Sequence, residues 1–132
     1  MDIQAFIDIV DDLSRDLNAR QRYQRMIETL HRSYQGSGIA CDAIALLKLE
    51  GDELRPVAVT GLKREALARR FRIREHPRLD IILQNPGVTR FAADSLLPDP
   101  YDGLVEDGRE RLHVHDCMGS AIHMDNKPWG VL

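Results

Sequence analysis

The strongest constraint on the fold is a pair of apolar segments joined by a short turn. Cys41 to Leu49 (CDAIALLKL) is almost continuously apolar, and Glu53 to Thr60 (ELRPVAVT) is typical of a returning strand. The residues between them, Glu50-Gly51-Asp52, predict a turn. Pro56 has no amide hydrogen to donate, so we expect it at a sheet edge or at a bulge. The chain therefore contains an antiparallel hairpin.

Two helices are predicted before this hairpin. A second helix follows Asn18 and ends within Gln35-Gly36-Ser37-Gly38, because glycine adopts the left-handed conformation that helix ends need. We expect the first helix to pack on the second or on another copy of itself, so residues 1–35 form a candidate dimer interface. Its apolar residues are three and four apart, as in a coiled coil: Ile3, Phe6, Val10, Leu13 and Leu17.

The rest of the chain mixes short helices, strands and one long loop. This order favours an α+β domain with an antiparallel sheet. Because the last predicted strand stops with the chain, we expect a C-terminally truncated piece of a longer protein, with one domain over 1–132 and its sheet and ligand site over 41–132. The expected helices are Lys63 to Arg70 and His76 to Gln84, and the loop is Ala92 to Arg111. The expected strands are Val88 to Phe91, Leu112 to Met124 (one strand, or two with a turn near Gly119) and Trp129 to Leu132.

Composition excludes several classes of protein. The 132 residues are 43% hydrophobic and 30% charged, which is ordinary for a soluble globular domain. A net charge of −3 argues against general adhesion to nucleic acid. No apolar run approaches the roughly twenty residues of a membrane span. The acidic N-terminus is unlike a signal peptide, and Cys41 and Cys117 are too few for a disulfide scaffold, so we predict a cytoplasmic protein.

A candidate cation site lies in an acidic, proline-containing segment. Pro98-Asp99-Pro100-Tyr101-Asp102-Gly103 places two carboxylates three residues apart in a turn. The prolines restrict the backbone, which lowers the entropy lost when both carboxylates converge on one ion. Asx turns use the same residue types, so a purely structural turn stays open as the alternative.

A second group of metal-ligand types follows in His113-Val114-His115-Asp116-Cys117. Positions two apart on a strand face the same way, which places His113, His115 and Cys117 on one face. Two carboxylates, an imidazole and a thiolate suit ferrous iron better than structural zinc or calcium. Arg78 is interpreted either as a surface ion-pair residue or as a cation that holds the anionic ligands.

The run FAADSLLPDPYDGL (Phe91 to Leu104), with HPRLD before it and HVHDCMG after it, resembles the N-terminal GAF domain of the NorR family of bacterial nitric-oxide-responsive transcription activators. GLKREALARRF (Gly61 to Phe71) also matches. The resemblance implies a six-stranded antiparallel GAF sheet flanked by helices, which holds mononuclear non-haem ferrous iron. A further aspartate of the family and a closing helix would lie beyond Leu132. The implied ligands are Asp99, Asp102, His115 and Cys117, with Arg78 as a ligand or gate.

The function that this resemblance implies is regulation without catalysis. Nitric oxide would bind the iron and relieve repression of an attached AAA+ ATPase, which activates nitric-oxide detoxification genes with an alternative sigma factor. Two alternatives stay open: a GAF domain that binds a small organic ligand or acts only in dimerisation, and a small metal-dependent hydrolase that uses the His113 and His115 pair.

Overall fold

The computed structural model describes residues 2–104 and 116–132, and has the predicted α+β composition. His113 and His115 lie outside the described residues. The elements in chain order are α1 (Ile3–Leu13), α2 (Ala19–Gly36), β1 (Ile44–Glu50), β2 (Glu53–Thr60), the 3-10 helix η1 (Arg64–Ala68), β3 (Phe71–Arg72), the 3-10 helix η2 (Ile73–Glu75), α3 (Pro77–Gln84), β4 (Thr89–Phe91), β5 (Cys117–Gly119), β6 (Ala121–Met124) and β7 (Lys127–Val131).

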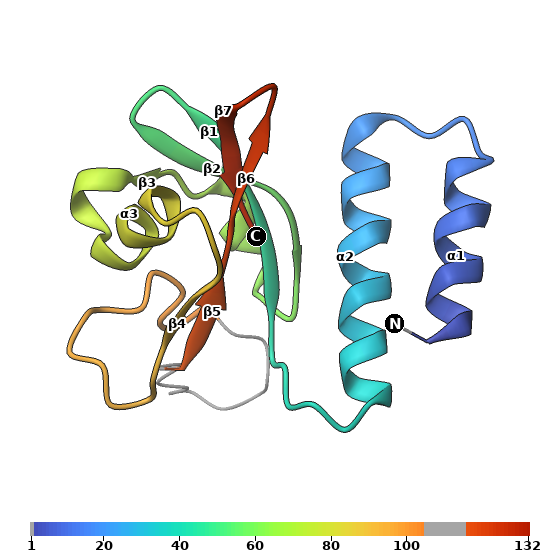
Figure 1. Cartoon of the computed structure of the whole chain (residues 1–132), viewed down its shortest axis with the longest axis horizontal. Coiled ribbons are helices and arrows are strands. Elements are labelled where there is room, and N and C mark those ends of the chain that lie inside the picture. Colours follow the sequence, from blue (N-terminus) through green and yellow to red (C-terminus); the bar gives the residue numbers. More distant parts are fainter. Residues whose placement is uncertain (1, 105–115) are drawn as a thin grey trace.

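The described strands form two antiparallel sheets (Figure 1). One has five strands in the order β3-β2-β1-β7-β6, and the other pairs β4 with β5. The expectation of one six-stranded sheet is therefore wrong for the described residues. β7 pairs with β1 and with β6, and no described strand pairs with both β5 and β1. The hairpin is confirmed, and the register shift that places Pro56 opposite Leu47 is the bulge expected at that proline.

The second helix begins and ends where its sequence predicts. The Asn18 side chain accepts from the Gln21 amide at 2.9 Å, and the Gln21 side chain accepts from the Asn18 amide at 3.1 Å, which makes a capping box. Gly38 follows the helix with φ +75°, which is the left-handed conformation expected there. No helix among the described residues is long and apolar enough to cross a membrane.

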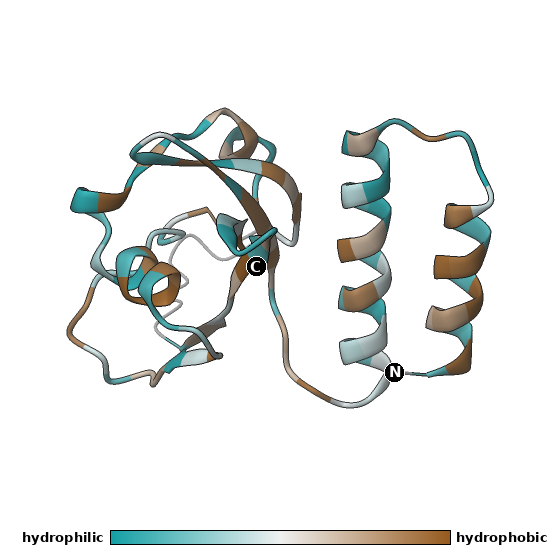
Figure 2. Cartoon of the chain, turned by 45° about the horizontal axis from the view of Figure 1, so that its top comes forward, coloured by the Kyte–Doolittle hydropathy of each residue, from teal (hydrophilic) through white to brown (hydrophobic). Residues whose placement is uncertain are grey.

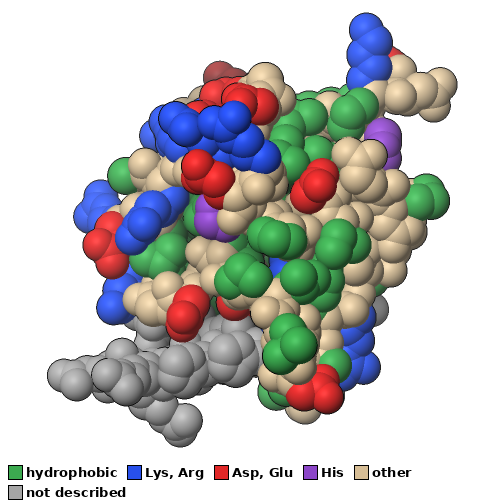
Figure 3. All heavy atoms as spheres, turned by 90° about the vertical axis from the view of Figure 1, so that its left-hand side faces the viewer, with side chains coloured by type: hydrophobic (Ala, Val, Ile, Leu, Met, Phe, Trp, Pro, Cys, Tyr) green, Lys and Arg blue, Asp and Glu red, His purple; other side chains and the backbone are tan. Residues whose placement is uncertain are grey.

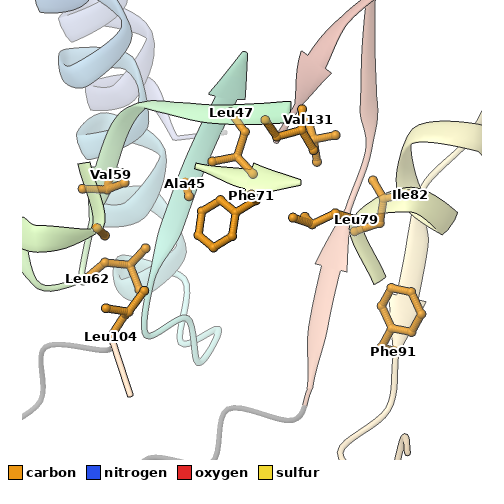
Figure 4. Packing of buried hydrophobic residues seen from close by; sticks show 12 residues of the cluster. Ala45, Leu47, Val59, Leu62, Phe71, Leu79, Ile82, Phe91, Leu104 and Val131 are labelled. Carbon is orange, nitrogen blue, oxygen red and sulfur yellow. The ribbon is translucent and has the colours of Figure 1, made fainter. Parts of the chain in front are cut away.

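The sheet carries apolar layers on both faces. On one face, Ile27 of α2 packs against Leu46, Val57 and Ala58. On the other face, α3, η1 and the segment after β4 cover a larger cluster, drawn in Figure 4. The helix expected over Lys63 to Arg70 is the shorter η1, which turns the small Ala66 into this core. The larger cluster contains Ala45, Leu47, Leu54, Val59, Leu62, Ala66, Phe71, Leu79, Ile82, Phe91, Leu104 and Val131.

The first helix contacts α2 and leaves its apolar stripe exposed (Figures 1 and 2). Phe6 is 57% exposed and Leu13 is 69% exposed, whereas Ala5 is buried. The expectation that the stripe packs on α2 is therefore wrong. Polar groups join the two helices instead, through the ion pairs of Arg25 with Asp12 and of Arg32 with Asp8. Leu17 lies beyond the end of α1.

Most of the basic segment 63–78 lies on the surface. Figure 3 shows the side of the molecule opposite α1, where Lys and Arg side chains gather with acidic side chains between them. Arg72, for example, is exposed and lies 3.7 Å from a carboxylate oxygen of Glu53 and 3.8 Å from one of Glu75. Arg78, which ends this segment, is the exception, because it is fully buried.

Candidate metal centre

Arg78 lies in the first turn of α3, directly after the proline that begins the helix. Its Nε donates to the carbonyl oxygen of Leu97 at 3.0 Å, and its Nη1 donates to Sγ of Cys117 at 3.3 Å. The guanidinium carbon lies 5.1 Å from the centre of the Phe91 ring. The interpretation of Arg78 as a surface ion-pair residue is wrong, since its side chain is 0% exposed.

This buried cation makes its surroundings favourable to negative charge. A guanidinium taken out of water is stable only when hydrogen bonds, an aromatic face or an anion replace its hydration. Leu97, Cys117 and Phe91 provide part of this replacement. The Nη2 of Arg78 is buried and has no hydrogen-bond partner among the described residues. The position next to Arg78 therefore favours a thiolate or another anionic group.

Cys117 begins β5, where it pairs with Phe91 of β4, and its side chain is half-buried. Burial raises the pKa of the Cys117 thiol, and the hydrogen bond and positive charge of Arg78 oppose that increase. The negative charges of Asp99 and Asp116 raise the pKa of Cys117 further. Arg78 is thus the group that stabilises the thiolate form of this cysteine, which is the form that binds metals.

The turn that contains Asp99 brings a second anionic group to the same region. Asp99 is buried, and its Oδ1 accepts from the amide of Tyr101 at 2.8 Å, which is an Asx turn. Tyr101 packs edge-on against Phe71, with ring centres 5.7 Å apart. Burial raises the pKa of Tyr101 beyond its usual range, and the charges of Asp99 and Cys117 raise it further. Asp99, Tyr101 and Cys117 therefore share one neighbourhood.

The structure brings some of the predicted site residues together and separates others. Arg78 from α3 donates to Cys117 from β5, and Asp99 from the loop after β4 lies near enough to Cys117 for its charge to raise the pKa of the thiol. Asp102 belongs to the same turn but is exposed, and His115 lies outside the described residues. Among residues 2–104 and 116–132, no group of three or more His, Cys, Asp and Glu side chains is arranged to hold a metal ion.

The donor chemistry of Asp99 and Cys117 fits ferrous iron. A carboxylate and a thiol, both sheltered from water beside a buried cation, provide the mixed hard and soft ligands that this ion accepts. Sequence reasoning missed Tyr101 and Phe91, which form the walls of this region. The signal for Tyr101 was its position between the two aspartates, where a partly buried aromatic ring also packs the turn against the core.

Solved structures identify the class of fold. The GAF domain of a phosphoenolpyruvate-protein phosphotransferase from Coxiella burnetii matches with a TM-score of 0.70 and 16% identity, covering 98% of this chain and 73% of that one. The corresponding Acinetobacter GAF domain matches with a TM-score of 0.70 and 13% identity. The chain therefore has the GAF fold. No protein-family model matches it.

Sequence similarity relates the chain to one group of proteins within this fold class. The chain is 49% identical over 126 residues to the nitric oxide reductase transcription regulator NorR1 of Cupriavidus necator, covering 95% of this chain and 24% of that protein. It is 43% identical over 132 residues to the anaerobic nitric oxide reductase transcription regulator NorR of Serratia proteamaculans. The chain is a GAF domain of the NorR family. It spans about a quarter of the length of these curated relatives.

Proposed function

We propose that this chain is the sensory domain of a transcription regulator that responds to nitric oxide, and that it holds mononuclear ferrous iron beside Arg78. The observation that carries the proposal is the fully buried Arg78, which donates to Cys117 and keeps one further nitrogen without a hydrogen-bond partner among the described residues. Such a cation stabilises an anionic ligand set. The names of the relatives, which are nitric oxide reductase transcription regulators, support nitric oxide as the signal.

The residues that would hold the iron are Asp99, Asp102, His115 and Cys117. When bound, ferrous iron supplies a position that coordinates nitric oxide. Arg78 balances the negative charge of the ligands and holds the carbonyl of Leu97, so that the loop after β4 stays against α3. The core around this loop excludes water, because the ring of Tyr101 packs against Phe71 there.

Arg78 also offers a way to pass the signal on. Its hydrogen bonds join α3 to the loop after β4 and to β5, so three segments depend on one side chain. A change of charge at Cys117 alters the hydrogen bond from Arg78 and shifts the balance between two positions of the loop. An attached AAA+ ATPase that contacts this loop would be repressed in one position and released in the other.

The proposal is tested by iron loading of single variants under anaerobic conditions. Asp99→Ala removes a buried carboxylate and Cys117→Ala a half-buried thiolate, so we expect iron content and the electron paramagnetic resonance signal that follows nitric oxide to fall to background. The same loss is expected for Asp102→Ala and His115→Ala. Cys41→Ala is the matched control, because Cys41 precedes β1 and its Sγ contacts the Ala43 carbonyl. Equal iron content in Cys117→Ala and Cys41→Ala would contradict the assignment.

We also propose that the domain forms a homodimer through the exposed stripe of α1. The stripe has the three-and-four spacing of a coiled coil, and Phe6 and Val10 lie at its centre with 57% and 47% exposure.

The alternative function, a GAF domain that binds a small organic ligand, has less support. A groove of about 200 Å³ between α1 and α2 is lined mainly by polar and charged side chains: Asp2, Gln4, Ala5, Asp8, Thr29, Arg32 and Ser33.

Replacing both Phe6 and Val10 with glutamate is expected to convert the dimer to a monomer, because four carboxylates would meet in the paired stripes. Sedimentation measures the change, and circular dichroism should show an unchanged sheet, since neither side chain is buried in the domain. Gln4→Glu adds negative charge to α1 outside the stripe and should leave the dimer intact. A wild-type protein that is monomeric at millimolar concentration would refute this assignment.

A further inference from the structure

Six basic side chains lie within one short surface segment, residues 63–75, which runs from η1 through β3 to η2. All six are exposed, and the segment holds only two acidic residues, so its local charge is +4 (six minus two) in a chain with a net charge of −3. Figure 3 shows Lys and Arg side chains gathered on this side of the molecule. We call the six residues the basic patch: Lys63, Arg64, Arg69, Arg70, Arg72 and Arg74.

The core holds this segment in one conformation. Phe71 of β3 is buried, and β3 pairs with β2. Near one end of the segment the amide of Lys63 donates to the carbonyl oxygen of Leu104 at 2.6 Å, and near the other the amide of Ile73 donates to that of Asp52 at 3.0 Å. Because packing and hydrogen bonds fix the backbone, little conformational entropy is lost when a partner binds the patch.

Most of the positive charge of the patch is not paired within the domain. Arg72 makes ion pairs, at 3.7 Å to Glu53 and 3.8 Å to Glu75, whereas the other five basic side chains make none with any described residue. In the α1–α2 hairpin, by contrast, Arg25 and Arg32 each pair with an aspartate. Neighbouring like charges repel one another, so an anionic partner relieves that repulsion and adds attraction of its own.

The composition of the patch fits a protein partner better than a nucleic acid. Five of its six residues are arginines, which are enriched in protein interfaces, where lysine is depleted. Leu67 is apolar and 41% exposed, and it shares one side of η1 with Arg64, because residues three apart face the same way in a 3-10 helix. Glu65 and Glu75 are exposed within the same segment, and both would repel a phosphate backbone.

We propose that the basic patch, together with Leu67, is a docking surface for an acidic amphipathic segment of a partner protein. Carboxylates of that segment pair with Arg64, Arg69 and Arg70, since a guanidinium group offers two parallel donors to a carboxylate. An apolar side chain of the same segment packs on Leu67 and keeps water away from these ion pairs. Charge steers the partner to the patch, and the apolar contact slows its release.

The patch and the candidate metal centre lie on opposite sides of one segment. Phe71 points inward and packs edge-on against Tyr101, with ring centres 5.7 Å apart, whereas its neighbours Arg70 and Arg72 are exposed. Successive side chains of an extended backbone point to opposite faces, which explains this arrangement. A partner on the patch therefore contacts none of the proposed iron ligands, and the docking and the iron are tested separately.

The docking is tested by titrating the full-length protein, at low salt, with a fluorescent peptide of about twelve residues in which most are glutamate and two are leucine. The double variant Arg69→Glu, Arg70→Glu is expected to bind this peptide about tenfold more weakly, because two attractions become repulsions. Arg20→Glu with Lys127→Glu is the matched control, since it changes the net charge equally at two exposed positions outside the patch. This control should bind like the wild type.

Two further measurements locate the contact and test its apolar part. Leu67→Ser should weaken the peptide about threefold, and it should not affect a peptide whose leucines are replaced by serine. Benzoylphenylalanine, a photoreactive residue, should link to the leucine-containing peptide when it replaces Leu67. It should not do so when it replaces Ile39, which is 53% exposed and lies outside the patch.

Several results would overturn the inference. No binding at low salt, or equal weakening in the patch variant and its control, would show that the patch does not select an acidic segment. Linking from position 39 as readily as from position 67 would place the peptide elsewhere. A DNA duplex that binds more tightly than the peptide, and is weakened by the same patch variant, would assign the surface to nucleic acid. Iron loading has no part in these measurements, so a failure of one proposal leaves the other standing.

Discussion

Arg78→Ala is expected to lower the free energy of unfolding by about 3–5 kcal/mol, as removal of one member of a buried polar network does. The side chain is 0% exposed, and it satisfies the Leu97 carbonyl, contacts Cys117 and lies over the ring of Phe91. Alanine would leave both a cavity and a buried carbonyl without its donor. Urea unfolding followed by fluorescence or circular dichroism measures the loss.

Arg78→Met separates packing from hydrogen bonding. Methionine fills most of the same volume and packs against Phe91, but it cannot donate to Leu97, so the expected loss is about 1–2 kcal/mol. Arg74→Ala is the matched surface control, because Arg74 lies nearby in sequence and is exposed, and it should change stability by less than about 0.5 kcal/mol. An Arg78→Ala variant as stable as Arg74→Ala would show that the buried arginine does not hold this region together.

Gly130→Ala is expected to separate β7 from β1, with a loss of about 3 kcal/mol in the free energy of unfolding. A Cβ atom at this position would lie 2.0 Å from the carbonyl oxygen of Leu47 and 3.0 Å from its carbonyl carbon. Both are backbone atoms of a central strand, so neither can move without breaking the β1 ladder. Thermal or urea unfolding measures the loss, and hydrogen exchange at Lys48 locates it.

Two other glycines provide controls for this substitution. Gly87→Ala meets no atom within 4 Å of the new Cβ, so it should be close to neutral. Gly51→Ala also has open space, but Gly51 has φ +64°, so the expected loss is about 1 kcal/mol from backbone strain alone. If Gly130→Ala were no worse than Gly51→Ala, close packing of β7 on β1 would not be what requires glycine there.

These two variants probe the framework of the candidate site from different directions. Arg78 ties α3 and the loop after β4 to Cys117, whereas Gly130 allows β7 to lie directly against β1. A protein that loses the first contact keeps its sheet but loosens the site. A protein that loses the second contact has a disturbed sheet next to the site.

Local signals in the sequence were sufficient to predict most of the helices, strands and turns. The capping box at Asn18, the glycines after α2 and the bulge at Pro56 follow from the chemistry of one or a few neighbouring residues. The antiparallel hairpin and the turn at Asp99 are of the same kind, because a hydrogen bond to a near neighbour in sequence decides each of them. The resemblance to NorR GAF domains, which rests on the segments 61–71, 76–80, 91–104 and 113–119, supplied the fold family.

Contacts between segments that are distant in the sequence decided which side chains are buried. Phe6 and Ile27 both lie on apolar helix faces in the sequence, yet Phe6 is 57% exposed and Ile27 is 0% exposed, because α2 covers the sheet and α1 covers only α2. Asp99 and Asp102 occupy one turn, yet only Asp99 is buried, since the core reaches one side of that turn. In the sequence, nothing distinguishes Arg78 from the other basic residues of the segment 63–78, most of which are exposed. The sequence by itself determined which segments form helices, strands and turns, because hydrogen bonding and apolar periodicity act over a few residues. Only the tertiary structure decided that Arg78 is buried against Cys117, because that contact joins residues 39 apart in the chain.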